Sequence, residues 1–156
     1  MAVQPIPEGY PRVTPYLNIA GAADAIDFYC KILGATERMR MDGPGGSIGH
    51  AELDLGGSVI MLADESPEVG NKSPGTLGGT PVSLMVYVED VDSTYGAAIA
   101  AGATEIQAVE NKFYGDRSGT LTDPFGHVWT ISTHKEDLTP EEIGSRFDAW
   151  NKQQQK

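Results

Sequence analysis

Two polar side chains, His50 and Glu52, lie in a segment where polar and apolar residues alternate. Residues 48–55 place apolar side chains, among them Ala51 and Leu53, at every second position, which is typical of a β-strand with one buried face. If the apolar set faces the core, the imidazole and the carboxylate point together toward the opposite face. The spacing therefore predicts that the two groups act as a pair.

A histidine and a carboxylate on one face of a strand have two chemical uses. They can bind one metal ion together with a third group, for which Asp116 is a candidate. They can also form a hydrogen-bonded pair that lines a polar pocket. We favour the hydrogen-bonded pair, because two potential metal ligands on one strand often occur by chance.

The segment Tyr114–Arg117 combines an aromatic ring, an acid and a base in a predicted loop. In one interpretation Arg117 binds an anionic or carbonyl group of a ligand, and Tyr114 covers that ligand. In the other, Asp116 and Arg117 form a surface ion pair that contributes little to stability. His134 precedes three charged residues and is expected to be solvated.

The hydrophobic periodicity predicts one order of elements twice. Each half is predicted to contain a strand, a helix and three further strands, and a glycine follows each helix. A final helix beginning near Thr139 carries an apolar stripe, Ile143, Phe147 and Trp150, which is predicted to dock on the rest of the chain. We predict one α+β domain, residues 1–156, made of unit one at about 12–63, a connector at 64–81, unit two at about 82–134 and a C-terminal helix at about 139–151.

Two short matches support a duplicated unit. Gly34–Glu37 and Gly102–Glu105 have the same sequence, and Asp54–Gly57 and Asp123–Gly126 share their first and last residues. The members of each pair are separated by about half the chain. Because both halves also show the same order of elements, we infer an internal repeat.

Strand alternation sorts the side chains of each predicted strand into two faces. The more apolar face is expected to pack on the helices, which leaves the other face for a ligand. This ligand face mixes apolar and polar groups, as small-molecule pockets usually do. Its predicted residues are Tyr16, His50, Glu52, Met61, Tyr87 and Thr130, with Tyr114 and Arg117 at the rim.

Several segments resemble the vicinal oxygen chelate superfamily, the glyoxalase and bleomycin-resistance proteins. Asp24–Gly34 resembles the first helix of these proteins, Val88–Asp92 the entry to their second helix, and Asp123–His127 their penultimate turn. His50–Leu53 and Tyr114–Arg117 resemble the PhnB-like branch more closely. The resemblance extends from about residue 12 to residue 142.

This resemblance implies a particular arrangement. The two units would lie side by side in one cupped mixed sheet, with the helices on its convex side and a ligand in the cup. It also implies a homodimer. Metal-dependent members place His or Glu ligands at matched positions on the first and last strand of each unit.

The matched positions in this chain carry Thr14, Met61, Ser83 and Thr130. Hydroxyl and thioether groups are poor ligands for zinc, nickel or ferrous iron. We therefore expect no metal at these positions, which argues against the metal-dependent reactions of the family.

The charge balance limits the classes of partner. The chain has 22 acidic and 11 basic residues, a net charge of −11, which argues against a nucleic-acid-binding protein. No segment is long and apolar enough for a membrane helix, and residues 1–13 do not resemble a secretory leader. A single cysteine, Cys30, fits a reducing compartment, so we expect a cytoplasmic protein.

Three functions remain open from the sequence. The first is a metal-independent small-molecule binding protein without a cofactor, whose carboxylates and aromatic rings suit a cationic or planar ligand. The second is a metal-dependent lyase, isomerase or dioxygenase with an unconventional site at His50 and Glu52. The third is a scaffold or dimerisation module whose cup binds nothing. Whether the chain is an enzyme is left open.

Overall fold

The computed structural model describes residues 3–155, so residues 1, 2 and 156 of the predicted domain lie outside it. The chain divides into two compact units, Met1–Thr80 (unit 1) and Pro81–Lys156 (unit 2). The strands are β1 (Tyr16–Ile19), β2 (Thr36–Asp42), β3 (Ile48–Leu55), β4 (Ser58–Asp64), β5 (Ser83–Tyr87), β6 (Thr104–Asn111), β7 (Asp116–Thr122) and β8 (Val128–His134). The α-helices are α1 (Ala22–Leu33), α2 (Pro74–Leu77), α3 (Val91–Ala100) and α4 (Pro140–Gln154), and short 3₁₀ turns lie at Pro44–Gly46 and Pro67–Val69.

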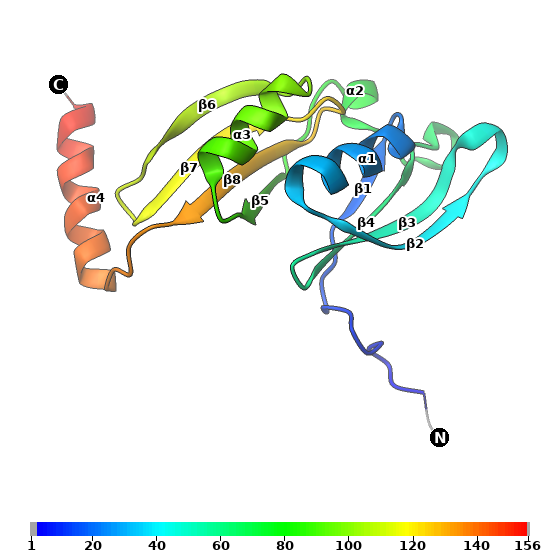
Figure 1. Cartoon of the computed structure of the whole chain (residues 1–156), viewed down its shortest axis with the longest axis horizontal. Helices are drawn as coiled ribbons and strands as arrows, with labels where there is room; N and C mark the ends of the chain where they lie inside the picture. Colours follow the sequence, from blue (N-terminus) through cyan, green and yellow to red (C-terminus); the bar gives the residue numbers. More distant parts are fainter. Residues whose placement is uncertain (1–2, 156) are drawn as a thin grey trace. The chain divides into compact units, whose positions relative to one another are not determined.

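Each unit is one four-stranded mixed sheet with a helix packed on it (Figure 1). The strand order is β1-β4-β3-β2 in unit 1 and β5-β8-β7-β6 in unit 2. In both units the first strand runs parallel to the last, and the remaining pairs are antiparallel. The predicted α+β class, two β-α-β-β-β units and a C-terminal helix, is confirmed. The single cup shared by both units stays a prediction.

The strand register of unit 1 decides which side chains face α1. Leu62 pairs with Leu17 on one side and with Ala51 on the other, and Leu53 pairs with Ile60. All five side chains are buried and form the core with the apolar stripe of α1. The opposite face, called here the open face of unit 1, therefore carries Tyr16, His50, Glu52 and Met61, as the alternation predicts.

Unit 2 repeats this pattern, with a glycine in the sheet beneath its helix. Trp129, Ile131 and Leu121 are buried on the side of α3. A Cβ atom at Gly119 would lie 2.8 Å from the Tyr95 ring, so only glycine fits there without a shift. The open face of unit 2 is the opposite side, with Met85, Tyr87, Thr120, Thr130 and Ser132.

The connector is more ordered than its proline and glycine content suggests. Glu65 accepts hydrogen bonds from the backbone N–H of Ser73 (2.8 Å) and the hydroxyl of Thr76 (2.9 Å). Ser73 is buried and caps the short helix α2. At the end of β4, Asp64 binds the backbone N–H groups of Ala22 and Ile48, which ties α1 to the sheet.

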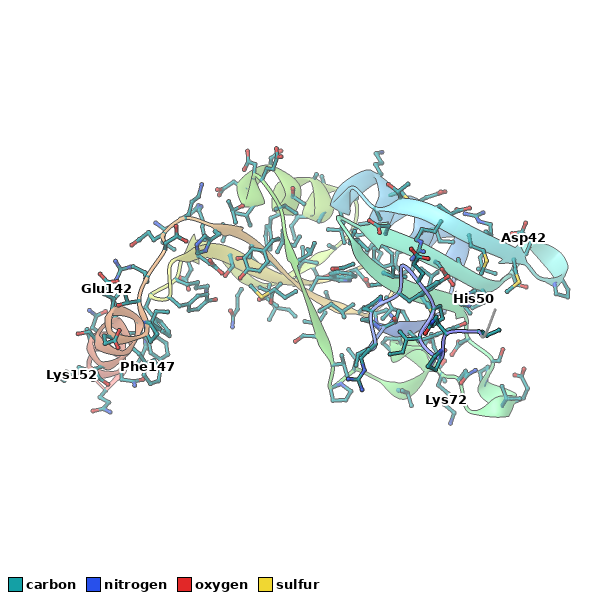
Figure 2. The ribbon with its side chains drawn as sticks, turned by 90° about the horizontal axis from the view of Figure 1, so that it is seen from below. Asp42, His50, Lys72, Glu142, Phe147 and Lys152 are labelled. Carbon is teal, nitrogen blue, oxygen red and sulfur yellow. The ribbon has the colours of Figure 1, made fainter. Side chains whose placement is uncertain are left out.

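The C-terminal helix α4 begins as the sequence predicts. Thr139 and Glu142 form a reciprocal capping box. Its predicted apolar stripe packs on the turn between β6 and β7, where the rings of Phe147 and Trp150 lie 5.3 and 5.8 Å from the ring of Phe113. Figure 2 labels Phe147 on α4. Within residues 3–155, none of the helices has the length and apolar character needed to cross a membrane.

Candidate functional site

Four side chains form a hydrogen-bonded chain on the open face of unit 1. The hydroxyl of Tyr10 donates to Oε2 of Glu52 at 2.8 Å. Oε1 of Glu52 lies 3.3 Å from Nε2 of His50, and Nδ1 of His50 lies 2.9 Å from the hydroxyl of Tyr16. Figure 2 labels His50 beside the N-terminal segment that carries Tyr10. The predicted pairing of His50 with Glu52 is therefore present, and it includes two tyrosines.

Glu52 carries the negative charge in this hydrogen-bonded chain of four side chains. Its side chain is buried, with the residue only 4% exposed. Burial raises the pKa of Glu52, but hydrogen bonds from Tyr10 and His50 and the positive charges of His50 and Arg38 outweigh it, so the pKa lies below its ordinary value. The carboxylate is therefore ionised at neutral pH and can only accept hydrogen bonds.

This fixed charge determines the tautomer of His50. Because ionised Glu52 cannot donate, a hydrogen bond between them requires the proton on Nε2 of the imidazole. When His50 is neutral, Nδ1 then has a lone pair and accepts the hydrogen bond from Tyr16. The chain of donors thus runs from Tyr16 to His50 to Glu52.

Tyr10 comes from outside the β-α-β-β-β unit, and sequence reasoning missed it. The guanidinium of Arg38 lies 4.7 Å above the centre of the Tyr10 ring and also donates to the backbone carbonyl of Gly9 (3.4 Å). The N-terminal segment is thereby held against the sheet over Glu52. A proline-rich lead-in has no periodicity that could have revealed this contact.

Apolar side chains accompany the polar chain on the same face. Met61 pairs with Tyr16 and with Glu52 on neighbouring strands. Met39 pairs with Glu52 and Met41 with His50, so both belong to the open face. The alternation of arginine and methionine in residues 38–41 was the available signal, which the sequence reading did not use.

The open face of unit 2 carries a second hydrogen-bonded network. Buried Asp116 accepts from the hydroxyl of Tyr87 (2.8 Å) and from Ser132 (3.3 Å), and its other oxygen lies 2.8 Å from Nδ1 of His134. Nε2 of His134 reaches Asp137 at 2.9 Å. Thr130 lies on the same face and contacts Thr120 at 3.0 Å.

His134 is exposed, as predicted, but it is not merely solvated. Hydrogen bonds to Asp116 and then to Asp137 raise the pKa of His134 above its ordinary 6.5. The hydrogen bond to Asp116 also raises the pKa of Tyr87. The network was missed because β8 continues one residue beyond the predicted strand, which puts His134 on the face of Thr130 and Ser132.

The structure places Arg117 away from the predicted ligand face. It lies within β7 and binds Asp92, at the start of α3, through two contacts of 2.7 Å. The predicted surface pair of Asp116 with Arg117 is wrong, because neighbouring residues of a strand point to opposite faces. Tyr114 lies in the turn before β7, with its ring 5.2 Å from that of Phe113, and its role as a cover stays a prediction.

The four positions at which the family resemblance implies metal ligands, Thr14, Met61, Ser83 and Thr130, carry side chains that do not suit a transition metal. Met61 lies on the open face of unit 1 and Thr130 on that of unit 2. Thr14 precedes β1, and Ser83 is the first residue of β5. Their hydroxyl and thioether groups suit neither zinc nor ferrous iron. Across residues 3–155, no three His, Cys, Asp or Glu side chains come together in an arrangement that could hold a metal ion. Asp116, the suggested third ligand, is bound to its partners in unit 2.

The fold and the sequence together define the family. Residues 12–131 match the Glyoxalase/Bleomycin resistance protein/Dioxygenase superfamily, and the chain belongs to it. Among solved structures, TioX from Micromonospora sp. ML1 is similar with a TM-score of 0.61 and 26% identity, over 83% of this chain and 100% of that one. A PhnB protein from Bacillus cereus has the same fold at a TM-score of 0.60 and 21% identity, over 79% of this chain and 99% of that one.

Relatives in sequence occur in bacteria and in a plant, and their names give no function. An uncharacterized protein of Mycobacterium tuberculosis (strain ATCC 25618 / H37Rv) is 43% identical over 142 residues, which cover 89% of this chain and 84% of the relative. Protein YjdN of Escherichia coli (strain K12) is 30% identical over 148 residues, 81% of this chain and 98% of the relative. The resemblance to the superfamily is thus confirmed. The names of these relatives do not identify a ligand, so the kind of ligand is inferred from the chemistry of the site.

Proposed function

We propose that the chain binds a small organic molecule on the open face of unit 1 without a metal ion. The observation that carries the proposal is the chain Tyr16–His50–Glu52–Tyr10, with the methionine side chains beside it. Polar groups of fixed orientation beside flexible apolar side chains are what small-molecule sites use for specificity and fit.

The charges favour a planar or cationic ligand. Glu52 is ionised, and the whole chain carries a net charge of −11, which attracts cations. The rings of Tyr16 and His50 lie 5.6 Å apart at 39°, and aromatic faces attract planar or cationic groups. Tyr87 and Thr130, on the open face of unit 2, stay predicted ligand contacts of that unit.

Methionine methyl groups give a direct test. Labelling with ¹³C-methyl methionine places reporters at Met39, Met41 and Met61 on unit 1 and at Met85 on unit 2. A panel of planar aromatic cations, each matched with a neutral and an anionic analogue, is titrated in the presence of a chelator. Cations should shift the signals of unit 1 most.

Two variants make this test specific. Glu52→Gln keeps the size of the side chain and removes its charge, so the preference for cations should be lost. Arg12→Gln, in the segment before β1, serves as a charge control. The proposal fails if no compound of the panel shifts a unit 1 methyl, or if the shifts are the same in Glu52→Gln.

A homodimer also belongs to this proposal. It rests on the family resemblance and on Phe147 and Trp150, two large apolar residues that are each 43% exposed. Light scattering over a wide concentration range measures the mass, and a constant monomer mass would rule the dimer out.

A further inference from the structure

Tyr16, His50 and Glu52 have the geometry of a nucleophile, a base and a group that orients the base. The Tyr16 oxygen lies 2.9 Å from Nδ1 of His50, within reach for proton transfer. Nε2 of the same ring faces Oε1 of Glu52 at 3.3 Å. This is the relationship by which enzymes activate a hydroxyl with an adjacent base that a third group holds in place.

We propose that these three residues form a proton relay that makes the Tyr16 hydroxyl a nucleophile for small activated acyl compounds. The inference rests on the proposed function, because the acyl compound would occupy the same open face. It goes beyond binding, because it assigns a reaction to a site that has no metal ligands at the family positions.

The step is balanced in atoms and charge. The Tyr16 oxygen attacks the acyl carbon, and its proton passes to Nδ1 of His50. The resulting imidazolium is stabilised by the carboxylate of Glu52. The bond between the acyl carbon and its leaving group breaks, and the proton on Nδ1 passes to the leaving group. The product is an aryl ester on Tyr16, and no redox partner is required.

The second network of the chain shows why the order of groups matters. Tyr87 donates directly to the carboxylate of Asp116, and His134 lies beyond that carboxylate. A carboxylate is a much weaker base than a neutral imidazole, so it holds the phenol proton without removing it readily. Burial raises the pKa of Tyr16, so its proton is not lost without help and the base beside it determines its reactivity.

Competitive acetylation within one chain tests the relay without knowledge of the ligand. N-acetylimidazole is added at neutral pH in limiting amount, and fragment-ion mass spectrometry measures the initial rates at Tyr16 and Tyr87. Tyr87 is the more exposed of the two, 60% against 48%, so accessibility alone predicts faster reaction at Tyr87. The relay predicts the reverse, with Tyr16 faster by at least about tenfold, a modest share of what a positioned base supplies.

Variants assign the effect to the named groups. His50→Gln should bring the rate at Tyr16 below that at Tyr87, and Glu52→Gln should lower it in part. His134→Gln, which alters only the network of unit 2, should leave the rate at Tyr16 unchanged.

Each outcome decides the inference. Reaction at Tyr87 as fast as at Tyr16 in the parent overturns it, and so does a rate at Tyr16 that His50→Gln leaves unchanged. The comparison within the parent chain needs no variant, so a variant that fails to fold does not affect it. If planar cations shift the methyl signal of Met61 while Tyr16 is unreactive, the proposed binding function stands and the relay falls. If Tyr16 is reactive and no compound binds, the binding function falls instead.

Discussion

The two units place the same types of group on their open faces in different orders. In unit 1 the imidazole of His50 lies between a tyrosine and a carboxylate. In unit 2 the carboxylate of Asp116 lies between a tyrosine and an imidazole. The first order lets a neutral histidine accept the proton of a phenol, whereas the second holds that proton on the phenol and favours a charged histidine. The two repeats therefore carry the same types of side chain, but they differ in which side chain accepts the hydrogen bond from the tyrosine.

Both networks are completed by a residue from outside their β-α-β-β-β unit. Tyr10, from the segment before β1, binds the far oxygen of Glu52. Asp137, from the segment between β8 and α4, binds the far nitrogen of His134. The N-terminal segment thus supplies a neutral donor to a carboxylate, and the C-terminal segment supplies a carboxylate to an imidazole. We therefore expect removal of the carboxylate to lower stability more in unit 2 than in unit 1. We also expect the two networks to lose stability at opposite ends of the pH range.

The largest difference is expected when the carboxylate is removed from each network. Asp116→Ala leaves three donors without their acceptor, and one of them, Ser132, is fully buried. This should lower the free energy of unfolding by about 1–3 kcal/mol, the usual cost of unpaired buried groups. Denaturant unfolding measures the loss. Asp137→Ala, which removes the exposed partner of the same histidine, should change stability little. Equal losses for the two variants would mean that Asp116 is not the centre of the network.

In unit 1 the same type of substitution should cost less. The partners of Glu52, Tyr10 and His50, are both partly exposed and can bind water instead. His50→Ala and Glu52→Ala should therefore each lower the free energy of unfolding by no more than about 1 kcal/mol. A double-mutant cycle checks this directly. If each single variant loses about 3 kcal/mol and the double variant recovers stability, the pair holds the fold together and is not available to a ligand.

Strand alternation predicted the open face of unit 1, and in unit 2 it was not applied to the start of β7. His50, Glu52 and Met61 were assigned to the correct face because the period of a strand is local information. Asp116 and Arg117 were taken as loop but belong to β7, and the role of Arg117 at the rim of a ligand site stays a prediction. Extending the strand to Asp116 would have put Arg117 on the side of Gly119 and Leu121, which face α3.

Contacts between distant segments could not be predicted from periodicity. Tyr10 and Glu52 are 42 positions apart, and Arg117 and Asp92 are 25 apart. Such pairs depend on how loops and chain ends return to the sheet, which residue spacing does not encode. The duplicated fold was predictable because the same apolar pattern and glycine positions occur in both halves.

The pH dependence of stability should differ in direction between the units. The pKa of His134 is raised in the folded chain, so its stabilising contribution is present below the ordinary value of 6.5 and is lost as the pH rises through the folded pKa. The pKa of Glu52 is lowered, so its contribution is present above the ordinary value of 4.5 and is lost as the pH falls through the folded pKa. Hydrogen exchange of β8 and β3 at several pH values should therefore show β8 weakening at alkaline pH and β3 at acid pH.

Substitution of His134 by glutamine gives the control for this experiment. The alkaline change in β8 should disappear in His134→Gln, while the acid change in β3 remains. If both strands lose protection at the same end of the pH range, the two networks are not independent and the contrast between them is wrong.

The smallest effect, and the most specific one, is expected for Tyr10→Phe. The substitution removes one hydroxyl from a side chain that otherwise stays in contact with Arg38 through its ring. Because the hydroxyl helps to lower the pKa of Glu52, its loss should move that pKa upward, toward or above 4.5. NMR titration of the ¹³C-labelled Glu52 carboxyl group measures the shift, which global unfolding would barely detect.

Arg38→Gln should move the same pKa upward as well, by removing a positive charge. A Glu52 titration that Tyr10→Phe leaves unchanged would mean that the N-terminal segment does not lie over the carboxylate in solution, and the network of unit 1 would then comprise only Tyr16, His50 and Glu52.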